Sequence, residues 1–169
     1  PNPEYAEKMG EIYVTMGVTA ENVANRYNVS RQDQDAFAYS SHMKAAKAQK
    51  EGYFTEIIPT PAAKFVRKPD GTLKKETFLQ DFDDGVRADT TLEGLAKLRP
   101  VFSPMGSVTA GNSSQTTDGA AASVIMSEAM VKKLGIKPIA KLKMYTTMGC
   151  KADEMGVGPA VAIPKLLSL

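Results

Sequence analysis

The sequence changes character near residue 107. Before this position the chain is mostly polar, and its apolar residues recur at helical spacing. After it, an apolar segment, a helical segment and a second apolar segment follow one another. Strands that alternate with helices form α/β layers, in which the helices cover a sheet. The sequence therefore predicts an α/β chain, with a helical first part and a second part made of a strand, a helix and a strand.

Two helices are predicted in the first third of the chain. The first has Thr19 as its N-cap, followed by small and apolar residues on one face. The second opens with Ser30 and Asp33 in the capping-box arrangement and ends at Gly52. One face of the second helix is expected to carry Phe37, Ser41, Ala45 and Ala48.

A strand, a hairpin and a short helix are predicted next. Residues 53–61 form an apolar run that ends in prolines, which indicates a short strand. A Pro-Asp-Gly turn at residues 69–71 indicates a hairpin. Thr90 precedes Glu93 by three residues, which is the capping-box spacing and predicts a short helix.

Beyond residue 107, residues 120–127 are small and apolar and predict a buried strand. A helix is expected from Ser127 to Leu134, with Gly135 ending it. The imperfect alternation of residues 139–148 predicts another strand.

The two ends of the chain suggest an internal segment of a longer protein. The sequence begins without Met, and Pro164 suits the first position of a helix that would then have only five more residues. A helix in a globular protein runs for about 10 to 14 residues. We therefore expect sequence on both sides of this segment.

Composition excludes several functional classes. Lys and Arg number 21 against 19 Asp and Glu, so a net charge of +2 gives no reason to expect a nucleic-acid partner. No run approaches the roughly 20 apolar residues of a membrane helix. A single Cys and a single His provide no metal-binding cluster and no internal disulfide, so we expect no metal and a reducing compartment. The cytosol or an organelle matrix satisfies this condition, and of the two we expect the cytoplasm.

The loop "TAGNSSQTTDGAAAS", residues 109–123, is the leading candidate site. Gly111 and Gly119 allow a close backbone approach, and the hydroxyl and amide side chains between them add polar groups without bulk. Such a loop suits a ligand rich in amides or phosphates. It lacks the endings of a P-loop or a dinucleotide fingerprint. A tight loop that leads into a buried strand is the alternative interpretation.

Cys150 is expected to be structural, and His42 is expected to be a helix-surface residue. A nucleophilic cysteine requires a neighbouring base or an electropositive pocket, and the only histidine lies over a hundred residues away within a predicted helix. The acidic stretch "QDFDDGVR" lacks the Gly and Glu positions of a calcium loop and predicts an exposed loop.

Several blocks of the sequence resemble the middle of a thiolase. These blocks are "MGVTAENVANRY", "SRQDQDAFAYSSH", "RADTTLEGLAKLRPVF", "SVTAGNSSQTTDGAAASVIMSEA" and "MGVGPAVAIP". The resemblance covers nearly the whole chain and implies part of the layered αβαβα thiolase fold. It implies a mostly helical loop domain that binds coenzyme A over residues 1–106, the last strand and helix of the N-terminal domain over 107–136, and the start of the C-terminal domain over 137–169.

The resemblance also assigns residues to coenzyme A, which is a substrate and not a tightly bound cofactor. Ser114 matches the family position that contacts the pantetheine arm, and Arg87 matches the arginine against the adenine end. Leu98 and Phe102 match apolar contacts along the cofactor. Residues near the acyl group are matched by Met16 and Met155.

By the same resemblance, no catalytic residue lies in this segment. The family uses one cysteine as nucleophile, a second as acid and base, and a histidine, and all lie outside the matching region. The expected parent is an acyl-CoA acyltransferase of fatty acid β-oxidation. Its expected partners are acyl-CoA, the remainder of its chain and further copies of itself in a homodimer or homotetramer. A non-catalytic thiolase-like acyl-CoA or lipid carrier is the alternative.

Overall fold

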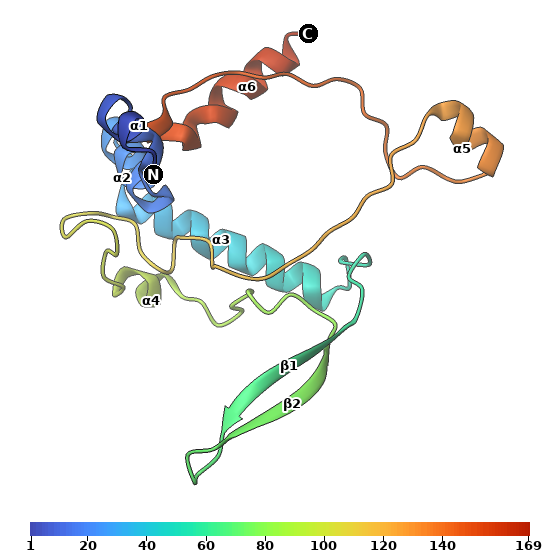
Figure 1. Cartoon of the computed structure of the whole chain (residues 1–169), viewed down its shortest axis with the longest axis horizontal. Helices are drawn as coiled ribbons and strands as arrows, with labels where there is room; N and C mark the ends of the chain where they lie inside the picture. Colours follow the sequence, from blue (N-terminus) through green and yellow to red (C-terminus); the bar gives the residue numbers. More distant parts are fainter. The chain divides into compact units, whose positions relative to one another are not determined.

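The computed structural model describes all 169 residues, which divide into two compact units. The first unit comprises Pro1–Val29, Val101–Val108 and Ser114–Leu169, and the second comprises Ser30–Pro100 and Thr109–Ser113. Figure 1 follows the elements along the chain. The two units are described separately below.

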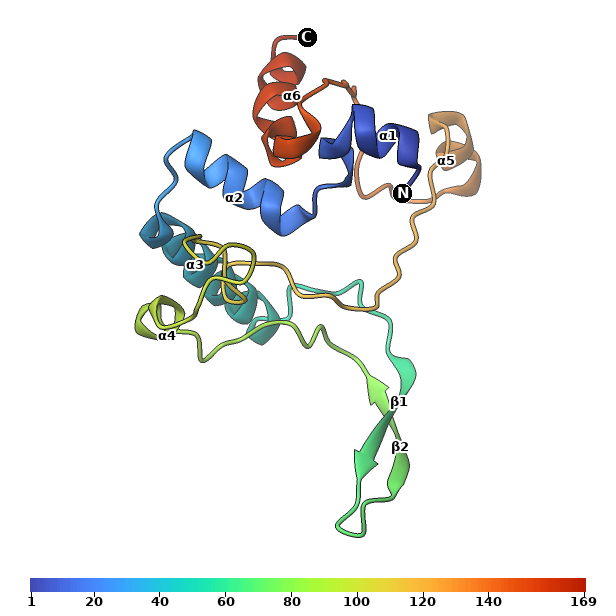
Figure 2. The same ribbon diagram turned by 60° about the vertical axis from the view of Figure 1, so that its left-hand side comes forward.

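The first unit is helical. Its elements are α1 (Pro3–Lys8), η1 (Gly10–Tyr13), α2 (Met16–Arg26), α5 (Glu128–Leu134), η2 (Ala152–Val157) and α6 (Gly158–Leu167). The 3₁₀ turn η2 contacts α2, η1 and α6. In contrast, α5 contacts no other helix or strand (Figures 1 and 2). Packing in this unit is therefore organised around η2. No helix of the chain combines the length and the apolar character that crossing a membrane requires.

Helix α2 begins one turn earlier than its sequence predicts. Thr15 is its N-cap, in extended backbone conformation. The predicted cap, Thr19, lies inside the first turn, where its N–H donates to the Thr15 carbonyl at 3.0 Å. The Thr19 hydroxyl donates to the Met16 carbonyl at 2.7 Å, so this buried side chain satisfies itself on its own helix. The prediction of Thr19 as the cap was wrong for this reason.

The second unit contains α3 (Arg31–Lys50), β1 (Thr60–Arg67), β2 (Leu73–Gln80) and α4 (Leu92–Ala96). Ser30 caps α3 as predicted, accepting a hydrogen bond from the Asp33 N–H at 3.1 Å, and Gly52 adopts φ +69° just beyond its end. The residues that were expected to share a face are not the ones that α3 buries. Phe37 is 79% exposed, whereas Asp35 is buried, and the contact between α3 and α4 includes a hydrogen bond from Arg31 to the Leu95 carbonyl.

The hairpin is confirmed, and the strand predicted over residues 53–61 is not. β1 and β2 pair antiparallel from Thr60 opposite Gln80 to Arg67 opposite Leu73, with Gly71 at φ +84° in the turn. β1 begins at Thr60 because this is the first residue that has a partner in β2, whereas residues 53–59 have none. The two strands contact each other and no other helix or strand, and they extend as a two-stranded arm (Figures 1 and 2).

Helix α4 forms as expected, but its cap is Thr91. The Thr91 hydroxyl oxygen accepts from the Gly94 N–H at 3.0 Å. The predicted cap, Thr90, instead donates its hydroxyl to the Arg87 carbonyl at 2.8 Å, in the turn before the helix. Of the two consecutive threonines, Thr91 is therefore the N-cap of α4, and Thr90 is not.

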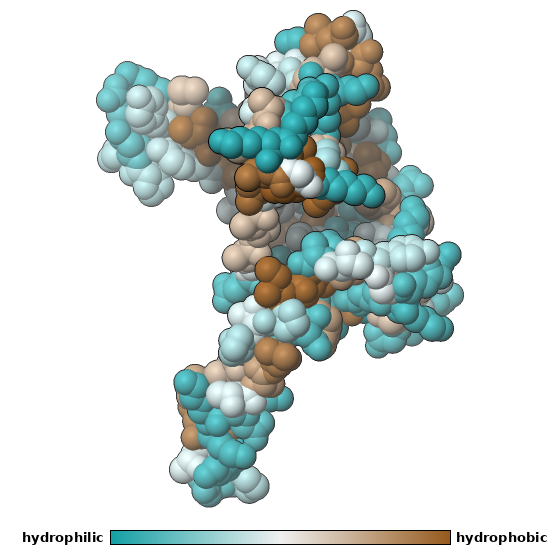
Figure 3. Space-filling model, turned by 90° about the vertical axis from the view of Figure 1, so that its right-hand side faces the viewer, coloured by the Kyte–Doolittle hydropathy of each residue, from teal (hydrophilic) through white to brown (hydrophobic).

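Neither strand predicted beyond residue 107 forms. Residues 120–127 and 139–148 have no strand pairing, and the side chains of Val124 and Ile125 are 86% and 88% exposed. A strand requires a neighbour for its backbone groups, and β1 and β2 are the paired strands of this chain. Hydrophobic atoms are consequently exposed at the surface (Figure 3).

Helix α5 between these segments is confirmed. Ser127 caps it, accepting from the Met130 N–H at 3.3 Å, and Gly135 ends it in left-handed conformation. Helix α6, in contrast, begins at Gly158 and contains Pro164 in its interior. The expectation that Pro164 opens this helix was wrong, because Pro159 already occupies the first turn.

Candidate functional site

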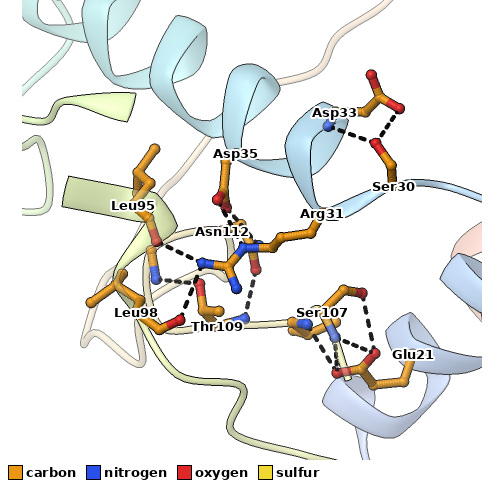
Figure 4. Close-up of polar contacts among 12 residues, drawn as sticks. Glu21, Ser30, Arg31, Asp33, Asp35, Leu95, Leu98, Ser107, Thr109 and Asn112 are labelled. Carbon is orange, nitrogen blue, oxygen red and sulfur yellow. Dashed lines mark hydrogen bonds and ion pairs between the residues drawn. The ribbon is translucent and has the colours of Figure 1, made fainter. Parts of the chain in front are cut away.

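The start of the small-residue loop is held rigidly in the second unit. Thr109 is fully buried, and its N–H donates to the side-chain oxygen of Asn112 at 2.7 Å (Figure 4). The Gly111 N–H donates to the Thr109 hydroxyl oxygen at 3.2 Å. Residues 109–113 therefore form a turn closed by its own side chains, which we call the anchored turn.

An ion pair on the first turn of α3 holds the anchored turn. The Arg31 Nε donates to Asp35 Oδ2 at 2.8 Å, and the Asn112 amide nitrogen donates to Asp35 Oδ1 at 3.0 Å. The Arg31 Nη2 donates to the carbonyls of Leu95 and Leu98 at 2.6 and 3.2 Å (Figure 4). One arginine and one aspartate thus join α3, the end of α4 and the anchored turn.

Gly111 has no room for a side chain. A Cβ atom placed on Gly111 would lie 2.5 Å from both Leu95 Cδ2 and Leu98 Cδ1. Leu95 is buried, so its side chain has little room to move. The backbone at residue 111 therefore packs directly on two leucines, one of which is the predicted cofactor contact Leu98.

A buried carboxylate organises the first unit in a comparable way. Glu21 on α2 is 5% exposed and accepts from the N–H groups of Ser107 and Val108 at 3.0 and 2.9 Å, and from the Ser107 hydroxyl at 3.3 Å (Figure 4). A Cβ atom on Gly106 would lie 2.1 Å from Glu21 Oε1. The segment leading into the loop is therefore fixed to α2 by one side chain.

The ring of the predicted contact Phe102 packs against Gly17 in the first turn of α2. A Cβ atom on Gly17 would come within 2.3 Å of its ring, so the ring covers the bare backbone of that glycine. Phe102 remains 42% exposed and the neighbouring Met16 60% exposed. Two of the predicted pocket residues are thus brought to one end of α2.

Met155 lies on η2, which an ion-pair cluster holds against α2. The Arg26 guanidinium pairs with Asp153 and donates to Glu154 Oε2 at 2.9 Å, and the Asn22 amide donates to the Asp153 carbonyl at 2.9 Å. The hydrogen bond that Asp153 accepts from Arg26 holds the pKa of the Asp153 carboxyl below the ordinary value of 3.8.

This pair predicts a pH dependence of stability in acid. Because the folded pKa of Asp153 is lowered, its contribution is fully present above pH 3.8 and declines as the pH falls through the lowered folded value. Replacing Arg26 with Met should raise the Asp153 pKa towards its ordinary value, measured by NMR titration of the carboxyl. The control Lys8→Met removes a charge that pairs with Glu4 and should leave the Asp153 titration unchanged. An unshifted Asp153 in Arg26→Met would contradict the assignment.

The other predicted residues are distributed as follows. Arg87 and Leu98 belong to the second unit, and Met16, Phe102, Ser114 and Met155 belong to the first. The Arg87 N–H donates to Nδ1 of His42 at 3.2 Å, so His42 orients the backbone that carries Arg87. Sequence reasoning treated His42 as a helix-surface residue and missed this contact. Cys150 is exposed, and its Sγ donates to the Met155 carbonyl at 3.8 Å.

Comparison with known proteins decides the family. A family model described as the N-terminal domain of thiolase matches residues 7–129. The chain belongs to the thiolase family. It is 47% identical to the 3-ketoacyl-CoA thiolase of Bacillus subtilis (strain 168), over 100% of this chain and 44% of the relative. It is 46% identical to the peroxisomal 3-ketoacyl-CoA thiolase of Homo sapiens, over 95% of this chain and 37% of the relative.

Solved thiolase structures share the fold. The dimeric peroxisomal thiolase of Saccharomyces cerevisiae superimposes with a TM-score of 0.80 at 35% identity, over 99% of this chain and 40% of that one. The acetyl-CoA acetyltransferase of Bacillus anthracis gives 0.76 at 41% identity, over 90% and 36%. The predicted fold, a part of the layered α/β thiolase fold, is confirmed. This thiolase chain spans less than half the length of these relatives.

Proposed function

We propose that the protein is an acyl-CoA acyltransferase of the thiolase type. The observation that carries the proposal is 47% identity, over the whole chain, to a protein named 3-ketoacyl-CoA thiolase. The reaction would be thiolytic cleavage of a 3-ketoacyl-CoA, or the reverse condensation, through an acylated cysteine. A non-catalytic carrier is not favoured, because the compared relatives bear the names of enzymes.

Within this reaction the chain binds coenzyme A and breaks no bond. One cysteine cannot serve as both nucleophile and proton carrier, and Cys150 has a backbone carbonyl as its hydrogen-bond partner. Binding energy from remote parts of a substrate positions the reacting thioester. The domain division at residues 106 and 136 is part of this proposal.

The site residues suit the parts of the ligand assigned to them. Arg87 offers a planar guanidinium that can stack on a purine or pair with phosphate. The apolar contacts Leu98 and Phe102 are both held in place, the first by Gly111 packing and the second by Gly17 packing. Exposed Ser114 follows the anchored turn directly. The proposed ligand is therefore a nucleotide with a long flexible amide arm.

A cytoplasmic location and a dimer or tetramer complete the proposal. The similar thiolase of Saccharomyces cerevisiae is dimeric, and the relatives include both bacterial and peroxisomal proteins. Fractionation of the source cells and light scattering of the purified full-length protein test these two points.

The activity itself is tested on the full-length protein. We expect CoA-dependent cleavage of acetoacetyl-CoA, of a long-chain 3-ketoacyl-CoA, or of both. The cleavage is measured as the loss of substrate absorbance. The relative rates measure chain-length preference. Binding of CoA without turnover of either substrate would support the carrier instead.

Ser114→Leu is expected to raise the apparent KM for CoA substrates about tenfold, which corresponds to 1.4 kcal/mol of lost binding. The leucine would fill the groove for the pantetheine arm. Ser114→Ala is the matched variant, because it removes the hydroxyl without adding bulk and should change KM far less. An unchanged KM in Ser114→Leu would reject this residue as a cofactor contact.

A further inference from the structure

We propose that Asp35 and Arg31 are positioning residues for the acyl-CoA site, acting through Asn112 and through the carbonyls of residues 95 and 98. They touch no ligand themselves. They hold two segments of the second unit: the backbone at Leu98, whose side chain is a proposed cofactor contact, and the anchored turn, which directly precedes Ser114 in the chain. The inference rests on the proposed function, since it assigns these residues a role in that site.

The ion pair of Arg31 and Asp35 has an energetic cost. Asp35 is 5% exposed, and burying a carboxylate is costly unless each oxygen is matched by a donor. Here both oxygens are matched, one by Arg31 and one by Asn112. A buried ion pair adds little net stability compared with a well-packed apolar pair. Packing alone therefore gives no reason to place charges at this point.

The charge of Asp35 orients the side-chain amide of Asn112. The Asn112 amide is used at both ends, with its nitrogen donating to Asp35 and its oxygen accepting from the Thr109 N–H. Because a carboxylate only accepts, Asp35 fixes which end of the amide faces Thr109. The charge thereby specifies the conformation of the anchored turn.

The same ion pair also holds the backbone at Leu98, the proposed apolar contact. Arg31 donates to the carbonyls at the end of α4 and just after it, at residues 95 and 98. The side chains of those two leucines pack on Gly111 of the anchored turn. Asp35 and Arg31 thus hold the anchored turn through Asn112 and through the two leucines, and a shift in either would move Leu98 and the anchored turn.

Asp33 provides a matched control on the same turn of α3. It is exposed, and its carboxylate accepts from the Ser30 hydroxyl at 2.6 Å, where it supports the helix cap. Removing Asp33 removes a carboxylate from the first turn of α3 without touching Asn112. It therefore separates a general effect on the helix from an effect on the anchored turn.

The test measures steady-state kinetics and CoA affinity in the full-length protein. Asp35→Ala should raise KM for the acyl-CoA about tenfold with kcat changed less than about twofold, the pattern of lost ligand positioning. Asp33→Ala should leave KM at the wild-type value. In a double-mutant cycle, the effects of Asp35→Ala and Asn112→Ala on the CoA dissociation constant should not be additive, because both variants remove the same hydrogen bond between Asn112 and Asp35.

Three results would overturn the proposal: a wild-type KM in Asp35→Ala, an equal rise in Asp33→Ala, or additive effects in the cycle. If Asp35→Ala does not fold, Asn112→Ala is judged by the same KM criterion against Asp33→Ala. The two proposals fail differently. A wild-type protein that neither binds CoA nor cleaves a 3-ketoacyl-CoA refutes the function, whereas wild-type binding with unaffected variants refutes only the positioning role.

Discussion

Replacing Glu21 with alanine is expected to lower the free energy of unfolding of the protein by roughly 3–5 kcal/mol, since a hydrogen bond to a charged group contributes about 1.5–3 kcal/mol. The buried carboxylate accepts from two backbone N–H groups, those of Ser107 and Val108. Alanine supplies no acceptor in its place. Urea unfolding measures the loss, and hydrogen exchange should show faster exchange at the amides of residues 107 and 108.

Two variants control this prediction. Glu21→Gln keeps the shape and one side-chain oxygen, so it should lose less stability than the alanine variant. Glu4→Ala removes an exposed carboxylate from α1 and should change the free energy of unfolding by less than about 0.5 kcal/mol. Equal midpoints for Glu21→Ala and wild type, with protected amides at 107 and 108, would show that the carboxylate does not hold this segment.

The Glu21 contact also bears on the proposed cofactor surface. The Val108 carbonyl accepts from the Val101 N–H at 3.0 Å. Glu21 therefore also fixes, through Val108, the backbone of the residue that precedes Phe102. Phe102 in turn packs on Gly17, on the same helix as Glu21. One buried side chain thus fixes a turn of backbone that carries Phe102, a proposed apolar cofactor contact.

Elements governed by local chemistry could be predicted from the sequence. The Ser30 cap and Gly52 bound α3, and the Ser127 cap and Gly135 bound α5, because a cap and a left-handed glycine act within a few residues of the chain. Where two threonines could cap the same helix, local signals could not choose between them. The contact between Thr19 and Met16 shows the physical reason for one such error.

Strand formation could not be predicted locally. The apolar run of residues 120–127 satisfies every compositional criterion for a buried strand, yet it has no neighbouring strand in this chain. The hairpin was predictable because its turn brings its own partner strand. A strand is a property of a pair, so composition in one segment is insufficient.

The candidate site was predictable only in part. The family resemblance supplied Arg87 and Ser114 as candidates, and the sequence marked the loop as unusually small. The contacts that hold the loop join residues far apart, such as Asp35 with Asn112 and Glu21 with Val108, 77 and 87 positions away. Only the Arg31–Asp35 pair left a local signal, its spacing of four residues on one helix.

Replacing Arg31 with methionine is expected to cost roughly 3–5 kcal/mol of unfolding free energy, because removing one partner of a buried ion pair leaves an uncompensated charge. Asp35 would keep only the Asn112 amide as its donor partner among the contacts described above, with its carboxylate still out of water. The carbonyls of Leu95 and Leu98 would lose the guanidinium as well. Urea unfolding of the full-length protein measures the change.

The double variant Arg31→Met with Asp35→Leu separates stability from positioning. Removing both charges together leaves no unpaired ion, so most of the stability lost in Arg31→Met should return. The apolar pair cannot orient the Asn112 amide, so KM for the acyl-CoA should stay raised as in Asp35→Ala. Recovery of both quantities would show that the ion pair only stabilises the second unit, whereas recovery of stability alone shows that the charges are kept for the conformation of the anchored turn.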